Sequence, residues 1–306
     1  MTRTGQRAKL SPVNDPAQRE REESLTYARP QTLGEAVKIL AGLDALVLCG
    51  GTDIFPAHVG RPLTRDIVDL SNVAELRGIR EESDHYRIGG ATSWTDILRA
   101  SLPPAFNALK QAAREVGSVQ IQNRGTIAGN LCNASPAADG VPPLLVLDAE
   151  VELTSHNHLR RMPLEKFITG YRKTALAKGE ILSAVLVPKS SGDSTSSFVK
   201  LGARRYLVIS IVMVAALLRR DAGGHIADAR VAVGAASAVA RRLPGLEHGL
   251  IGLPAGKRPS AILSAAHVAD LTPIDDVRAT AAYRSDAALR LIGQALDRAV
   301  GVASGV

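Results

Sequence analysis

Cysteine and aromatic residues are scarce in this sequence of 306 residues. Cys49 and Cys132 are its only cysteines, which excludes a disulfide framework, a four-cysteine zinc site and an iron–sulfur cluster held by this chain alone. Aromatic residues make up 3% of the chain, so we expect a core built from Ala, Val, Leu and Ile. We expect both cysteines to be free thiols, which fits a reducing, cytoplasmic location.

Long apolar segments are also missing. The longest apolar run covers residues 206–218, which is too short to span a bilayer. Pairs of arginines flank this run, so we expect a buried element with solvated ends. Residues 1–23 are polar and aperiodic, without the apolar segment of a signal peptide, and we expect a disordered tail.

Several familiar site motifs are absent. No G-x-G-x-x-G follows a predicted strand, there is no G-x-S-x-G, and "GLPAGKRP" around Lys257 has the wrong spacing for a phosphate loop. His156 and His158 form an H-x-H pair without a third nearby ligand, which favours a surface turn over a metal site. We therefore expect no metal in this chain and no catalytic side chain. If the protein is an enzyme, a bound cofactor supplies the chemistry.

Basic residues outnumber acidic ones, which gives the chain a net charge of +7. Solubility explains this most simply, and a face that docks an acidic partner protein is the next interpretation. The basic residues are scattered and have no interleaved aromatic residues, so we do not expect nucleic-acid binding.

What is present indicates an α+β protein. Thr32 and Glu35 have the spacing of a capping box at the start of a helix, and a second helix is expected after a cap at Thr92 or Ser93. Residues 104–117 have the pattern of an amphipathic helix. "VPPLLVLDAEVEL" suits a helix followed by a strand, "EILSAVLVP" a strand stopped by Pro188, and residues 275–300 a final long helix.

Two glycine-rich segments, "CGGTDI" (49–54) and "NRGTIAGN" (123–130), share one pattern of glycines beside Thr, Asp or Asn. Glycine lets the backbone come close to a ligand, and successive N–H groups form a nest for an anion. Thr52 and Thr126 add hydroxyl groups. The sequence thus predicts a pyrophosphate held between two loops. Two tight turns at strand ends explain the same spacing.

Seven segments in order resemble one family. They are "YARPQTLGEAVKIL", "LVLCGGTDIF", "RIGGATSWTDIL", "QIQNRGTIAGNLCNASPAADGVPPLLVLDAEVEL", "GYRKTALAKGEILSAVLVP", "FVKLGARR" and "DDVRATAAYR". Together they resemble the FAD-binding, medium subunit of the xanthine dehydrogenase / carbon monoxide dehydrogenase family of molybdenum hydroxylases. One departure is Ala128, where many members have Gly.

The resemblance implies an α+β, vanillyl-alcohol-oxidase (PCMH)-like FAD-binding fold of two subdomains plus a smaller α+β C-terminal domain. We expect the FAD-binding domain over residues 24–190, with subdomains of about 24–75 and 76–190. "SSGDSTSS" supports a linker at 191–197, and the C-terminal domain of the molybdenum-hydroxylase flavoprotein type is expected over 198–300.

The resemblance also implies which residues contact FAD. Two loop segments would hold its diphosphate: Val47, Leu48, Cys49, Gly50, Gly51, Thr52, Asp53 and Ile54 in the first, and Gly125, Thr126, Ile127, Ala128, Gly129 and Asn130 in the second. Further family positions that contact FAD or lie near the flavin are Asp139, Ile181, Leu182 and Lys200. Other interpretations are a helix cap for Asp139, an exposed strand lysine for Lys200, and ordinary core for Leu182.

The implied function is electron transfer within a heterotrimeric molybdenum hydroxylase, an oxidoreductase. A large subunit would carry the molybdenum cofactor, and a small subunit two [2Fe–2S] clusters. This chain would pass electrons to NAD, oxygen or a quinone. The alternatives are a self-sufficient FAD-dependent oxidoreductase of the same fold and a binding module without flavin.

Overall fold

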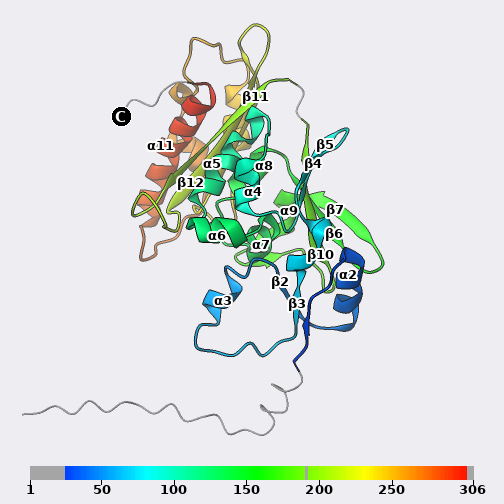
Figure 1. Cartoon of the computed structure of the whole chain (residues 1–306). Coiled ribbons are helices and arrows are strands. Elements are labelled where there is room, and N and C mark those ends of the chain that lie inside the picture. Colours follow the sequence, from blue (N-terminus) through cyan, green and yellow to red (C-terminus); the bar gives the residue numbers. More distant parts are fainter. Residues whose placement is uncertain (1–24, 190–191, 302–306) are drawn as a thin grey trace, which may run out of the picture.

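The computed structural model of the protein describes residues 25–189 and 192–301, so the tail predicted for residues 1–23 lies outside them. The described residues form three larger sheets and one small two-stranded sheet, and in space helices lie between the second and third of the larger sheets (Figure 1). In the described part of the chain, no helix is both long enough and apolar enough to cross a membrane.

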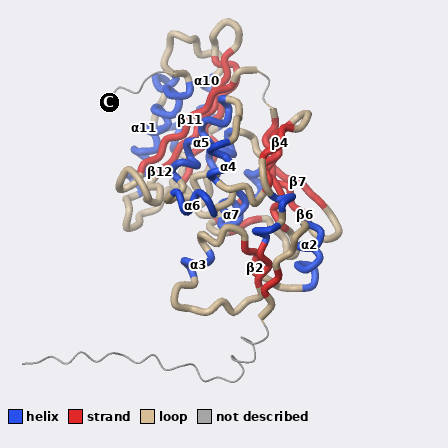
Figure 2. Tube along the Cα trace, viewed as in Figure 1, coloured by secondary structure: helices blue, strands red, loops and turns tan. Residues whose placement is uncertain are grey.

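The first sheet is small and parallel. Its strand order is β1 (Tyr27–Ala28), β3 (Ile67–Asp69), β2 (Leu46–Leu48). Helix α2 (Leu33–Gly42) begins at the predicted capping box, in which the Thr32 hydroxyl accepts from the Glu35 N–H at 3.1 Å. Between β2 and β3 the chain is mostly loop, interrupted by the short helix α3 (Ile54–Ala57), as Figure 2 shows.

The second sheet has five antiparallel strands, in the order β4 (Ile79–Glu81), β5 (His85–Gly89), β10 (Ile181–Pro188), β6 (Glu150–Thr154), β7 (Leu159–Pro163). Strand β10 ends at Pro188, as predicted. Its residues from Ile181 to Val187 are all buried, because the central strand of a covered sheet is enclosed on both faces.

Short helices fill the space beside this sheet. Ser93 caps α4 through a capping box with Asp96, and residues 104–117 contain α5, both as predicted. The remaining elements of this region include the predicted helix–strand pair α8–β6. The elements are α4 (Trp94–Arg99), α5 (Asn107–Glu115), α6 (Val119–Arg124), α7 (Ile127–Asn133), α8 (Val141–Val146), α9 (Leu164–Phe167), β8 (Ile168–Gly170) and β9 (Lys173–Thr174).

The third sheet is antiparallel, in the order β11 (Ser194–Leu201), β12 (Val212–Arg220), β13 (Ile226–Gly234), β14 (Arg241–Arg242). Helix α11 (Ala281–Ala299) packs on one face, and α5 and α8 lie on the other (Figure 1). Helix α10 (Pro244–Leu250) packs against β13. Short 3₁₀ helices occur at Leu70–Asn72, Ala74–Leu76, Pro104–Phe106, Pro259–Ile262 and Ala265–Val268.

Three predicted elements have different limits. The linker expected at 191–197 is wrong from Ser194 onward: this serine begins β11, and the Ser196 hydroxyl donates to the Ala105 carbonyl at 2.6 Å. The final helix starts at Ala281 rather than residue 275, because Thr280 caps it. The apolar run 206–218 is buried only in its second part; Tyr206, Leu207 and Ile209 are exposed in the loop before β12.

One buried hydrophobic cluster extends across the predicted domain limit near residue 190. Phe198, Met213 and Leu217 of the third sheet belong to the same buried cluster as Leu109 of α5 and Leu144 of α8. One face of the third sheet is therefore covered by helices that precede it in the sequence. We keep the predicted domain limits as a proposal.

Candidate cofactor site

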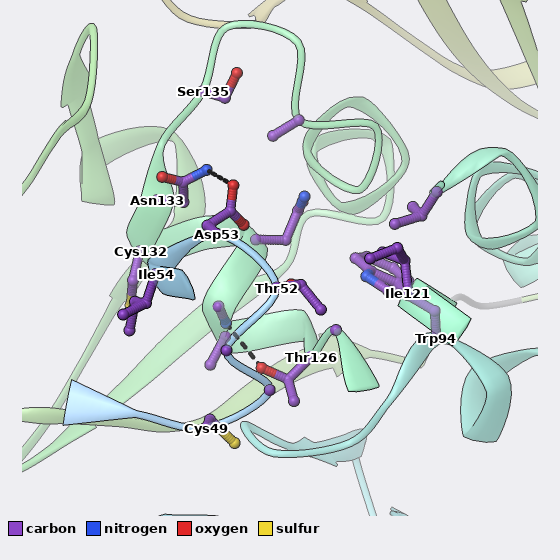
Figure 3. A pocket seen from close by; sticks show the side chains of 18 of the residues that line it. Cys49, Thr52, Asp53, Ile54, Trp94, Ile121, Thr126, Cys132, Asn133 and Ser135 are labelled. Carbon is purple, nitrogen blue, oxygen red and sulfur yellow. Dashed lines mark hydrogen bonds between the residues drawn. The ribbon is translucent and has the colours of Figure 1, made fainter. Parts of the chain in front are cut away.

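The site is a cavity of about 880 Å³ that is lined by residues from the regions of all three larger sheets. Figure 3 shows part of its lining. This volume is at the upper end for small-molecule sites and suits a large, extended cofactor. The cavity is lined by sixteen of the eighteen predicted site residues: Val47, Cys49, Gly50, Gly51, Thr52, Asp53, Ile54, Gly125, Thr126, Ala128, Gly129, Asn130, Asp139, Ile181, Leu182 and Lys200.

Two predicted residues do not line the cavity. Leu48 and Ile127 are buried, and Ile127 belongs to the core beneath the second loop. The N–H of Ile127 donates to the Thr92 carbonyl at 3.1 Å, so it is already used. Both residues are better explained as anchors that hold the ends of the two loops.

The first loop, which follows β2, has an open backbone. Gly51 has φ of 73°, in the left-handed region that glycine adopts readily. Within the described residues, the N–H groups of Gly51, Thr52 and Asp53 donate to no protein acceptor. Consecutive free N–H groups around a left-handed residue form an anion-binding nest.

Gly50 has a different role, because it lets the two loops touch. A Cβ at this position would lie 2.0 Å from the Arg124 carbonyl oxygen, just before the second loop. Backbone cannot move aside as a side chain can. Gly50 is therefore required by packing between the loops, whether or not a ligand is bound.

In the second loop, most backbone N–H groups already donate to acceptors within the protein. Ala128 N–H donates to the Gly90 carbonyl at 3.0 Å, and Gly129 N–H donates to the Thr126 hydroxyl at 3.1 Å, which caps α7. The second loop is therefore the capped start of a helix and offers no comparable run of free N–H groups among the described residues, while a pyrophosphate between the two loops stays a prediction. Asn130 differs from its neighbours, because its buried Oδ1 has no hydrogen-bond partner among the described residues.

Asp139 and Lys200 meet as a buried ion pair at the cavity wall. Lys200 Nζ lies 2.6 Å from Asp139 Oδ2, and the Ser210 hydroxyl donates to Asp139 Oδ1 at 2.6 Å. Burial raises the pKa of Asp139, while the Lys200 ammonium acts in the opposite direction. Asp139 is thus no helix cap, since Gly140 caps α8 without a side-chain bond, and Lys200 is no exposed strand lysine.

Ile181 and Leu182, at the start of β10, supply an apolar wall. Both are buried and both line the cavity. A Cβ on Gly90 would lie 2.2 Å from the Leu182 carbonyl oxygen, so glycine allows the turn after β5 to pack directly on β10. Leu182 is therefore a core residue and a cavity residue at once.

Sequence reasoning missed a polar chain beside the first loop. Arg172 Nη1 donates to Asn133 Oδ1 at 2.5 Å, and Asn133 Nδ2 donates to Asp53 Oδ1 at 3.0 Å (Figure 3 shows the second bond). All three residues line the cavity. "GYRKTAL" was among the matching segments, but nothing in it indicates that Arg172 reaches the end of α7.

The single tryptophan was also missed. Trp94 is fully buried in α4 and lines the cavity near Ile121 (Figure 3). A Cβ on Gly140 would lie 2.5 Å from the Trp94 ring. A lone tryptophan in a sequence with few aromatic residues was the available signal.

The cysteines are free, as predicted, and both line the cavity. Burial raises the pKa of the Cys49 thiol, and burial raises that of Cys132 to about 12. Both thiols are therefore protonated at neutral pH and act as small apolar groups. His158 lies beside the tight turn after β6 as expected, and contacts Glu180 at 3.3 Å.

The chain matches two family models. The FAD binding domain in molybdopterin dehydrogenase matches residues 21–190, and the CO dehydrogenase flavoprotein C-terminal domain matches residues 197–299. A xanthine dehydrogenase FAD-binding subunit from Escherichia coli O157:H7 is 32% identical over 92% of this chain and 97% of its own length. The carbon monoxide dehydrogenase medium chain from Hydrogenophaga pseudoflava is 28% identical over 89% of this chain and 96% of its own length.

Solved structures agree with these relatives. A chain of carbon monoxide dehydrogenase from Hydrogenophaga pseudoflava superimposes with a TM-score of 0.82 at 28% identity, covering 92% of this chain and 98% of its own. A chain of quinoline 2-oxidoreductase from Pseudomonas putida 86 gives 0.81 at 25% identity, covering 91% and 98%. The predicted fold is confirmed. This chain belongs to the FAD-binding subunits of the molybdenum hydroxylase family, which are oxidoreductase subunits.

Proposed function

We propose that this chain is the electron-transfer subunit of a heterotrimeric molybdenum hydroxylase. It accepts electrons from two [2Fe–2S] clusters in a small subunit and delivers them to NAD, oxygen or a quinone. The molybdenum cofactor is in a large subunit, where the substrate reacts. The relatives support this organisation, because one is a dehydrogenase medium chain and another a FAD-binding subunit. We also propose a cytoplasmic location.

The residues of the cavity fit FAD. The free N–H groups of Gly51, Thr52 and Asp53 suit a diphosphate, which would bind without a lysine. The unpartnered Oδ1 of Asn130 suits a hydrogen-bond donor on the cofactor, since a buried polar atom is rarely left unpaired. Ile181 and Leu182 offer an apolar surface for the flavin ring. We therefore assign these residues and the other predicted residues that line the cavity to FAD binding.

Bound FAD supplies a store for two electrons that can be filled one at a time. The chain's own residues set the conditions. The Lys200 ammonium, at the cavity wall, would stabilise negative charge on a cofactor bound there. Asp139 holds the Lys200 ammonium in place, and Trp94 with the buried wall of β10 keeps water away from the apolar part of the cavity.

One observation carries this proposal. A buried, fixed cation, Lys200, borders the same cavity as three free backbone N–H groups. A site for a diphosphate alone would not need the buried ion pair. In a site for a redox-active ring, this cation would stabilise negative charge on the ring.

The test begins with FAD, identified by absorption and by the mass of the released cofactor. The iron–sulfur subunit of the same complex is then reduced and mixed with the flavin-loaded chain under anaerobic conditions. We expect the flavin absorption to bleach within a single mixing experiment. Flavin that is retained but is never bleached by the reduced subunit would refute the electron-transfer role. Turnover by the isolated chain with a soluble substrate would instead favour a self-sufficient oxidoreductase.

A further inference from the structure

Glu180 is a buried carboxylate at the edge of the cofactor cavity. Its side chain is 1% exposed, and it lines the cavity directly before Ile181 and Leu182 at the start of β10. Enclosing a charge costs free energy unless partners compensate for the lost water. The contacts of Glu180 therefore show what the carboxylate does at this position.

Arg160, on the edge strand β7, holds the Glu180 carboxylate with two hydrogen bonds. Arg160 Nε donates to Oε1 at 2.6 Å, and Nη2 donates to Oε2 at 2.8 Å. The Ala177 N–H also donates to Oε2 at 2.8 Å, and His158 Nε2 lies 3.3 Å from Oε1. The bonds from Arg160, opposed by burial and aided by that from Ala177, lower the pKa of Glu180 to about 2, so it is ionised at neutral pH.

The same arginine reaches the segment between β9 and β10. Its Nη2 also donates to the Ala175 carbonyl at 2.8 Å, next to Leu176, which lines the cavity. Glu180 closes this segment from the other end, because its N–H donates to the Ala177 carbonyl at 3.1 Å. The ion pair thus ties Leu176 and the start of β10 to β7, across the intervening strand β6.

Glu152, on strand β6, provides a comparison. Its buried carboxylate accepts from Arg87 at 2.8 Å and from Arg161 at 3.1 Å. Successive side chains of a strand point to opposite faces, so Arg160 and Arg161 of β7 serve different faces of the second sheet. Neither Glu152 nor its two arginines line the cavity. Of these two buried networks in one sheet, that of Glu180 alone borders the cofactor site.

We propose that Arg160 and Glu180 are positioning residues for FAD: their ion pair fixes the apolar wall against which the flavin ring packs. This inference rests on the proposed function, because it requires FAD in the cavity with its ring beside Ile181 and Leu182. The pair holds Leu176 and the start of β10 in one arrangement. A rigid planar ring binds best to a surface whose side chains are fixed before the ring arrives.

The test compares Glu180→Gln with Glu152→Gln in the full chain. Each change removes one buried negative charge from an arginine network of the same sheet, so we expect similar losses of stability in urea without FAD. We expect the Kd for FAD, measured by fluorescence titration, to rise at least ~10-fold in Glu180→Gln and by less than ~2-fold in Glu152→Gln. Iodide should also quench bound flavin more strongly in Glu180→Gln, because a loosened wall admits solvent to the ring.

A second pair of variants keeps the charges. Arg160→Lys and Arg161→Lys retain the cation, but a lysine lacks the planar fork that bonds to both carboxylate oxygens. Arg160→Lys should weaken FAD binding, and Arg161→Lys should leave it unchanged. This pair decides the question if Glu180→Gln does not fold, as judged by circular dichroism.

The outcomes separate the two proposals. If the wild-type chain binds FAD and the Glu180 and Glu152 variants bind it equally well, or lose it equally, the positioning role is wrong and the FAD site stands. If FAD affinity falls in Glu180→Gln while iodide quenching is unchanged, the wall is not what the pair fixes, which also overturns the proposal. If the wild-type chain cannot be loaded with FAD, the proposed function fails and this inference fails with it.

Discussion

The two glycine loops look alike in sequence and differ in the folded protein. In the first, Gly51, Thr52 and Asp53 keep their N–H groups free, and the backbone turns through a left-handed residue. In the second loop, which is the capped start of α7, the N–H groups of Ile127, Ala128 and Gly129 already donate to protein acceptors. Glycine therefore has two roles. In the first loop it leaves backbone N–H groups accessible to a ligand, and in the second it allows close packing.

The difference has a structural cause. The first loop follows an edge strand of a small parallel sheet, where neighbours on one side are few. The second packs against the turn after β5, where the Thr92 and Gly90 carbonyls accept the N–H groups of Ile127 and Ala128. We infer that the first loop provides most of the binding energy for a diphosphate, and that the second provides rigidity.

The largest effect is expected where the loops touch. Gly50→Ala places a Cβ about 2.0 Å from the Arg124 carbonyl, so the loops must move apart. We expect loss of about 1–3 kcal/mol in the free energy of unfolding and loss of FAD from the purified protein. Gly42→Ala is the control, because nothing lies within 4 Å of its added Cβ. Normal FAD content in Gly50→Ala would contradict the contact between the loops.

Gly51→Val tests the open nest. A β-branched residue at a φ of 73° is strained by roughly 1–2 kcal/mol, and it displaces the free N–H groups. We expect FAD affinity, measured by fluorescence titration, to fall at least ~100-fold (about 2.7 kcal/mol). The free energy of unfolding, measured without FAD, should fall by less than the free energy of FAD binding. Full FAD retention would remove the nest assignment.

A paired threonine experiment compares the hydroxyl groups of the two loops. Thr126 caps α7, so Thr126→Ala should cost about 1 kcal/mol in urea unfolding of the FAD-free protein. The Thr52 hydroxyl makes no described hydrogen bond within the folded chain, so Thr52→Ala should change stability by less than ~0.5 kcal/mol. Equal losses in both variants would mean that the loops are structurally equivalent after all.

The smallest stability effect is expected at Gly129. An added Cβ would meet only the Thr126 hydroxyl, at 3.0 Å, and the position is helical, where alanine is favoured over glycine. For Gly129→Ala, we expect the free energy of unfolding to change by less than ~0.5 kcal/mol and the affinity for FAD to fall roughly 10-fold. Unchanged affinity would show that the second loop stays away from the cofactor.

Local pattern predicted much of the fold. The capping boxes at Thr32 and Ser93, the helix α5 and the strand β10 each follow from nearby residues alone. The linker prediction was wrong because a run of serines is typical of flexible segments. In the folded protein, the Ser196 hydroxyl donates to the Ala105 carbonyl before α5, and the Ser197 hydroxyl donates to the Ala295 carbonyl in α11. Such partners, far away in the sequence, leave no local trace.

Most helices and strands, the two cavity-lining loops and the family could be predicted from the sequence, because caps, periodicity and ordered motifs depend on short segments. The folded arrangement alone shows which N–H groups stay free among the described residues, that Asp139 pairs with Lys200, and that Arg284 bonds to both Ile211 and Asp276. Hydrogen bonds and ion pairs are satisfied by whichever group arrives in space, and residues 61 or 73 positions apart become neighbours only when the chain has folded.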